Sequence, residues 1–63
     1  MWTVVYMTQD RENALQIRKA LEDGEILTKI RALKKSDESY CYEILVPSTE
    51  VDKSHEKILE AEL

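Results

Sequence analysis

Residues 2–7 read Trp-Thr-Val-Val-Tyr-Met, a run of β-formers with no turn residue inside it. Such a run is typical of a strand in a small sheet, so we expect a strand here. Two amphipathic segments and a hairpin-like segment follow, and each needs this strand to pack on or pair with. The pattern does not show which side of the strand faces the core, because its even-numbered and odd-numbered residues are similarly apolar.

Residues 11–23 carry the spacing of an amphipathic helix. The polar residues 8–10 can cap its start, and Gly24, the single glycine of the chain, suits a left-handed residue that closes it. The apolar stripe of this helix comprises Ala14, Ile17 and Leu21, with Leu15 beside it.

The period then changes to two, which predicts strands over residues 25–34 and 40–46. The polar break between them predicts an antiparallel hairpin. Its loop contains no Asn-Gly or Gly-Gly pair, so we expect a loose connection through residues 36–38. Pro47 lacks an N–H for the ladder and should end the second of these strands.

A second helix is predicted from about Thr49 to near residue 63, with Ser48 as its cap. Its spacing predicts a buried stripe with two flanking residues. The stripe comprises Val51, His55, Ile58 and Leu59, and the flanking residues are Ser54 and Glu62.

The predicted element order is strand, helix, strand, strand, helix, which indicates one α+β domain over residues 1–63. It is the ferredoxin-like βαββα arrangement with its last strand missing. We expect a three-stranded sheet in the order 1-3-2, with strand one parallel to strand three and both helices on one face.

This arrangement leaves two surfaces for a partner: the outer edge of strand one, which carries no charge or proline, and the sheet face opposite the helices. The candidate partner-binding residues are Trp2, Val4, Val5, Tyr6, Leu27, Lys29, Arg31, Leu33, Cys41, Glu43 and Leu45. Trp2 is a candidate anchor for a partner, although it can equally fill the margin of the core.

Charge and motif content exclude several classes of function. Thirteen acidic against nine basic residues give a net charge of −4, which disfavours nucleic acid and anionic membranes as partners. No long apolar segment or signal-peptide pattern is present, so we expect a cytoplasmic protein. One cysteine and one histidine supply neither an internal disulfide nor a metal site. No cofactor motif is found.

The residue pattern also resembles a known family. Residues 1–6, the apolar stripe of residues 14–21, and the stretch Ile44-Leu45-Val46-Pro47-Ser48 leading into an acidic helix are similar to the small prokaryotic signal-transducing proteins. That family is grouped by fold with the nitrogen-regulatory PII proteins. The resemblance implies a PII-like, ferredoxin-like domain with a regulatory role, and it implies no catalytic residues. The chain is far shorter than PII proteins and lacks their long modified loop and their ATP-binding residues.

We therefore expect a regulatory interaction module and no enzyme, acting as a homodimer or with an unidentified protein partner. One alternative is a metabolite sensor whose ligand lies at a subunit interface. Another alternative is a minimal redox or enzyme activity that uses Cys41 or His55. Against it, we expect the Cys41 thiol to be buried in a sheet face and the His55 ring to pack at the edge of the core. The acidic clusters at both helix ends should be solvated charge.

A stacking platform for nucleic-acid bases is a further alternative, and the net charge disfavours it. Its aromatic residues would be Trp2, Tyr6, Tyr40 and Tyr42.

Overall fold

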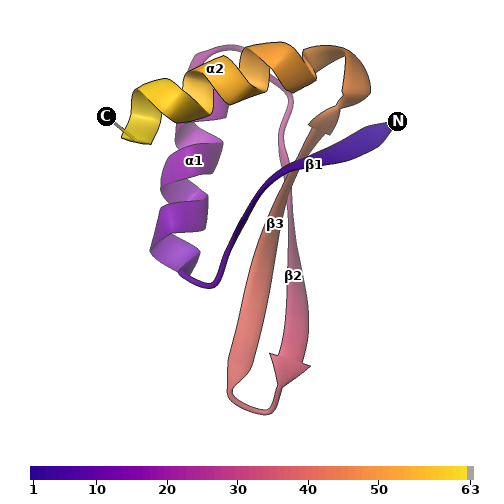
Figure 1. The fold of residues 1–63 in the computed structure, drawn as a ribbon, viewed down its shortest axis with the longest axis vertical. Coiled ribbons are helices and arrows are strands. Elements are labelled where there is room, and N and C mark those ends of the chain that lie inside the picture. Colours follow the sequence, from indigo (N-terminus) through magenta and orange to yellow (C-terminus); the bar gives the residue numbers. More distant parts are fainter. Residues whose placement is uncertain (63) are drawn as a thin grey trace.

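Three strands form one sheet and two helices pack beside it in the computed structural model, which describes residues 1–62 (Figure 1). The sheet order is β1-β3-β2, as predicted, so β3 is central and β1 and β2 are the edges. This part of the chain is therefore a small α+β domain. The elements are β1 (Trp2–Thr8), α1 (Arg11–Asp23), β2 (Lys29–Ser36), β3 (Ser39–Pro47) and α2 (Val51–Glu62), with a 3-10 turn at Ser48–Glu50 before α2.

The central strand β3 runs antiparallel to both neighbours. The prediction that strand one lies parallel to strand three is therefore wrong. The chain leaves β1 and returns through α1, so β1 and β2 point the same way, and the hairpin then makes β3 oppose both of them.

The core lies between the helices and one face of the sheet. Both helices contribute to the same cluster of buried side chains, so they cover the same face. The three residues predicted for the α1 stripe are all in it. The buried cluster comprises Ala14, Ile17, Leu21, Ile26, Ile44, Val46 and Ile58, with Val5, Tyr6, Ile30, Tyr42 and Val51 packed against it.

The bounds of α1 are confirmed, but its C-terminal end is not built by a left-handed glycine as predicted. Asp10 caps the start, because its Oδ1 accepts the backbone N–H of Glu12 at 3.0 Å. At the other end Gly24 has a φ of −87°, and the positive φ of 62° belongs to Glu25. The prediction of a left-handed Gly24 is wrong. The turn at Glu25 brings Ile26 back into the core, where its N–H donates to the Leu21 carbonyl at 3.0 Å.

The hairpin is tighter than predicted. Ser36 pairs with Ser39, so only Asp37 and Glu38 form the turn, and the register shifts at Lys35. Among the described non-glycine residues only Glu25 has a positive φ, so this turn is not of the primed types that need one. Lys35 has no partner on β3, so it forms a bulge next to the turn, and this bulge lets the two strands meet without a primed turn.

The second helix turns a different side to the core than the one predicted. Its buried residues are Ser54 and Ile58, with Val51 half-buried, whereas His55 is exposed and Leu59 is 65% exposed. Both stripes satisfy helical spacing, so only packing distinguishes them. Burial of Ser54 is tolerated because its Oγ donates to the carbonyl of Glu50 at 2.7 Å.

The start of α2 also differs, because the Ser48 side chain makes no capping hydrogen bond. The Ser48 backbone N–H instead donates to the carbonyl of Met1 at 2.8 Å, which ties the beginning of β1 to the end of β3.

Candidate interaction surface

The sheet face opposite the helices carries side chains from all three strands, and we call it the open face. Ile44 and Val46 point into the core, so the alternate residues of β3 point the other way. Residues paired with these complete the face; Leu45, for example, lies between Val4 of β1 and Lys29 of β2. The open face comprises Trp2, Val4, Met7, Lys29, Arg31, Leu33, Cys41, Glu43 and Leu45.

A bulge in β1 decides which of its residues reach the open face. The register with β3 shifts between Val4 and Tyr6, so the side-chain alternation changes sides at Val5. Trp2 and Val4 point to the open face before the bulge, and Met7 does so after it. Val5 and Tyr6, which we included in the predicted surface, pack against the core instead.

The centre of the open face is buried although no helix covers it. Leu45 is 5% exposed and Cys41 is 6% exposed, because the edge strands hold side chains on both sides of them. Trp2, Val4 and Met7 on β1 are exposed. The open face therefore presents an apolar patch along β1 that continues into the buried centre of β3.

The charges of the open face are largely paired with one another. Arg31 donates from Nε and Nη2 to Oε1 of Glu43, at 2.8 and 2.6 Å, and the Glu43 side chain is only 12% exposed. The Nζ of Lys29 lies 5.0 Å from the centre of the Trp2 ring, a cation–π contact. Covering this face would therefore bury few unpaired charges.

Cys41 and His55, the candidates for chemistry, are placed apart from each other and from any cluster of reactive groups. Cys41 lies on the open face opposite Leu33, and the nearby cation Arg31 is held by Glu43. His55 lies on the exposed side of α2, which corrects the prediction that its ring packs at the core's edge. Within residues 1–62 the His55 ring has no ion-pair or hydrogen-bond partner.

The aromatic residues proposed as a base-stacking platform do not share a face. Trp2 lies on the open face, whereas Tyr6 and Tyr42 pack against the core. Tyr40 shares the side of Tyr42, because both are even-numbered residues of β3. The stacking arrangement that a platform needs is therefore not formed.

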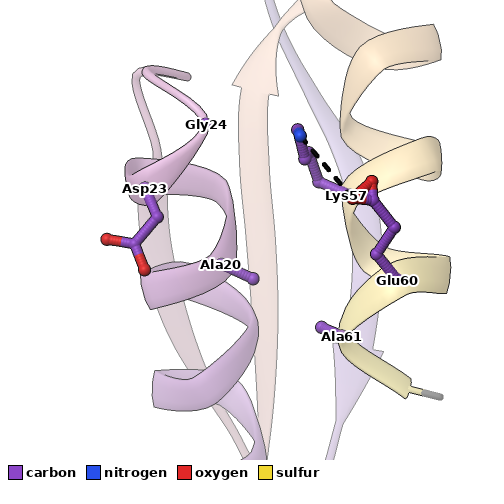
Figure 2. A pocket seen from close by; sticks show the side chains of 6 residues that line it. All are labelled: Ala20, Asp23, Gly24, Lys57, Glu60 and Ala61. Atoms are coloured by element: carbon purple, nitrogen blue, oxygen red, sulfur yellow. Dashed lines mark ion pairs between the residues drawn. The ribbon is translucent and has the colours of Figure 1, made fainter.

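A shallow cavity of about 280 Å³ lies between the ends of the two helices (Figure 2). Asp23 and Glu60, which belong to the two acidic clusters that we expected to be solvated, line its walls, and both are exposed. The two carboxylates do not converge: Asp23 is paired with Lys19 at 3.2 Å, and Glu60 is paired with Lys57 at 3.6 Å. Figure 2 shows Asp23 turned away from α2. The cavity thus holds no free acid–base pair.

Sequence reasoning placed the β2 and β3 members of the open face correctly, left the side of Trp2 and Val4 undecided, and missed one member. Met7 was not predicted, because only the bulge at Val5 turns it outward. Leu27 was predicted on this face, but it precedes β2 and is exposed outside the paired strands. A bulge leaves no signal in a run of uniformly apolar residues, so the pattern alone does not locate it.

Within residues 1–62, no three histidine, cysteine or acidic side chains are grouped as metal ligands would be. In the same part of the chain, neither helix has the length and apolarity that crossing a membrane requires. Comparison of the chain with protein-family models, with curated proteins and with solved structures finds no match.

Proposed function

We propose that this chain is a small interaction module that associates with a second copy of itself through the open face. The observation that carries the proposal is the exposed apolar row of Trp2, Val4 and Met7 beside the buried Leu45. A contiguous apolar patch of this kind favours an interface over a solvated surface.

The composition of the open face suits a second copy. Two sheets that pack face to face lie about 10 Å apart and bury their inward side chains between them. The Arg31–Glu43 pair is already formed within one copy, so a second copy need not supply a counter-charge. A chain of this length buries only roughly 60% of its unfolded surface on its own, and a dimer would add to a thin core.

The outer edge of β1 is the competing surface. Residues 2–8 contain no charge or proline, and an exposed edge strand can pair with another chain. The bulge at Val5, however, interrupts the regular backbone spacing that strand addition uses. We therefore favour the open face over the edge.

We further propose that the fold is ferredoxin-like without its last strand, in a cytoplasmic protein with a regulatory role. The antiparallel order β1-β3-β2 supports the fold proposal, since the missing strand would lie along the outer edge of β1. The regulatory role is motivated by the resemblance to small signal-transducing proteins and stays a prediction.

The test compares Trp2→Glu with Tyr40→Glu. Trp2 is 40% exposed on the open face and Tyr40 is 46% exposed on the other side of the sheet, so the second variant is a matched control. Molar mass is measured by light scattering from micromolar to millimolar protein at high ionic strength, where contacts between exposed charges are screened.

We expect the natural chain and Tyr40→Glu to form dimers and Trp2→Glu to stay monomeric, with circular dichroism verifying that both variants are folded. A natural chain that is monomeric throughout, or a Trp2→Glu variant that dimerises as well as the control, would overturn the proposal.

A further inference from the structure

Besides the open face, a groove lies on the helix side of the sheet, between α1 and β2, and we call it the α1/β2 groove. Its volume is about 250 Å³. The floor is formed by Ile30, Ala32 and Tyr42, and Leu15 forms part of the α1 wall. The groove is distinct from the open face, because these floor residues lie on the core side of the sheet.

The groove is apolar inside and has no cover. Ala32 and Leu15 are exposed, and Ile30 and Tyr42 are only half-buried. Figure 1 shows the reason: the turn of the β2–β3 hairpin extends beyond the N-terminal end of α1, so the helix does not cover all of the hairpin. Apolar side chains at such a site gain from being covered.

Two arginines line the groove. Arg11 and Arg18 are seven residues apart on α1, which places them on one side of the helix about 10 Å apart along its axis. Arg18 is engaged only through Nε, by Glu22 at 3.5 Å, and Arg11 makes no ion pair with the rest of residues 1–62. An occupant should therefore be apolar with carboxylates beside it.

The outward side of α2 has this chemistry. Leu59 is 65% exposed, although every other leucine of the helices is more buried. Asp52 and Glu56 lie seven and three residues before it, both exposed, and this spacing puts them on the same side of the helix as Leu59. The core uses Ser54 and Ile58 instead, so the fold itself leaves this side of α2 without a contact.

We infer that α2 of one copy docks into the α1/β2 groove of another copy. Leu59 enters the apolar floor, and Asp52 and Glu56 face Arg11 and Arg18, whose long side chains accommodate the difference in spacing. The docking is of the helix-in-groove kind.

This contact differs in symmetry from the dimer proposed above. It joins two different surfaces, so each copy keeps a groove and a helix free for the next, and the assembly grows as a ring or a chain. It also depends on charge and should weaken with salt. The inference does not rest on the open-face dimer, which uses the other side of the sheet.

The test is a charge exchange at low ionic strength, made in the Trp2→Glu chain so that the open face is blocked. Arg18→Glu changes the groove and Glu56→Arg changes the helix, and each should weaken self-association roughly tenfold, since an exposed attraction becomes a repulsion. Mixing the two variants should restore association, because the altered groove then meets the altered helix. Glu38→Arg in the hairpin turn is the matched control and should change nothing.

Leu59→Ala provides a readout independent of charge and should also weaken the association. The inference is overturned if the Trp2→Glu chain is monomeric at low salt, if its association persists unchanged at high salt, or if the mixture associates no better than either variant alone. A monomeric Trp2→Glu chain at low salt and a mixture that fails to associate both leave the high-salt dimer untouched, so the two proposals can fail separately; only persistence of Trp2→Glu association at high salt would count against both.

Discussion

The substitution Gly24→Ala tests how the end of α1 is built. Gly24 has φ −87° and ψ 12°, a conformation that alanine adopts without strain. A Cβ there would lie 3.1 Å from Cε of Lys57 and 3.3 Å from its Cδ and Cγ. These are tight contacts, but they are with a flexible side chain that can move by a few tenths of an ångström.

Two effects of opposite sign therefore set the magnitude. Replacing glycine by alanine at a compatible position stabilises a protein by about 0.4–1 kcal/mol, because the unfolded chain loses freedom. Displacing Lys57 offsets part of this gain. We expect Gly24→Ala to be nearly neutral in the natural chain and to show the whole gain in a Lys57→Ala background, which corresponds to about 2–8 °C in Tm for a domain of this size.

The assay is thermal and urea unfolding of the four proteins of this double-mutant cycle, followed by circular dichroism. The coupling between the two sites is the quantity that reports the close approach. A loss of about 1 kcal/mol or more for Gly24→Ala in the Lys57→Ala background would refute the reasoning, because it would indicate that Gly24 needs a left-handed backbone.

Two further predictions concern the core and pH. Leu21→Ala should lower the free energy of unfolding by about 2–5 kcal/mol, whereas Leu59→Ala should change it by less than about 0.5 kcal/mol, since Leu21 is fully buried and Leu59 is 65% exposed; equal losses in urea unfolding would contradict the placement of α2. Burial raises the pKa of Tyr6 above 10.0, and the hydrogen bond and charge of Glu62 raise it further, while the hydrogen bond with Asn13 lowers it. The folded chain therefore holds the Tyr6 proton more tightly than the unfolded chain, so this stability is complete below pH 10 and is lost as the pH rises above it. Tyr6→Phe should make the alkaline loss of stability less steep, and an unchanged slope would contradict this.

The two proposed contacts should respond differently to salt concentration. The exposed row on β1 of the open face is apolar, Arg31 and Glu43 are already paired with each other, and Lys29 lies over the Trp2 ring, so association through this face should persist at high salt. The α1/β2 groove and the outward side of α2 carry opposite charges, so their contact should respond to ionic strength. Salt would then select between a closed dimer and a growing assembly.

Local chemistry alone determined a large part of the fold. The bounds of α1 were predictable because Asp10, a capping residue, and the turn beginning at Gly24 flank a regular apolar stripe. The strand order followed from the succession of elements and the preference for right-handed crossovers, although the same reasoning gave the wrong direction for β1 against β3. Six members of the open face, those in β2 and β3, were predictable in the same way, because the alternation in these two strands is regular where those residues lie.

Only the tertiary structure decided the features for which two local solutions are equally good. Ser54 and His55 both fit a helical stripe with Ile58, and packing in the fold buries Ser54. The Ser54 hydroxyl can be buried because it donates a hydrogen bond to the Glu50 carbonyl in the preceding turn. In β1 both sides are apolar, and the bulge at Val5 reverses which side faces the core, so even-numbered residues face outward before it and Met7 faces outward after it. Periodicity tells which residues share a side of an element, but the side that is buried is set by contacts with residues distant in the sequence.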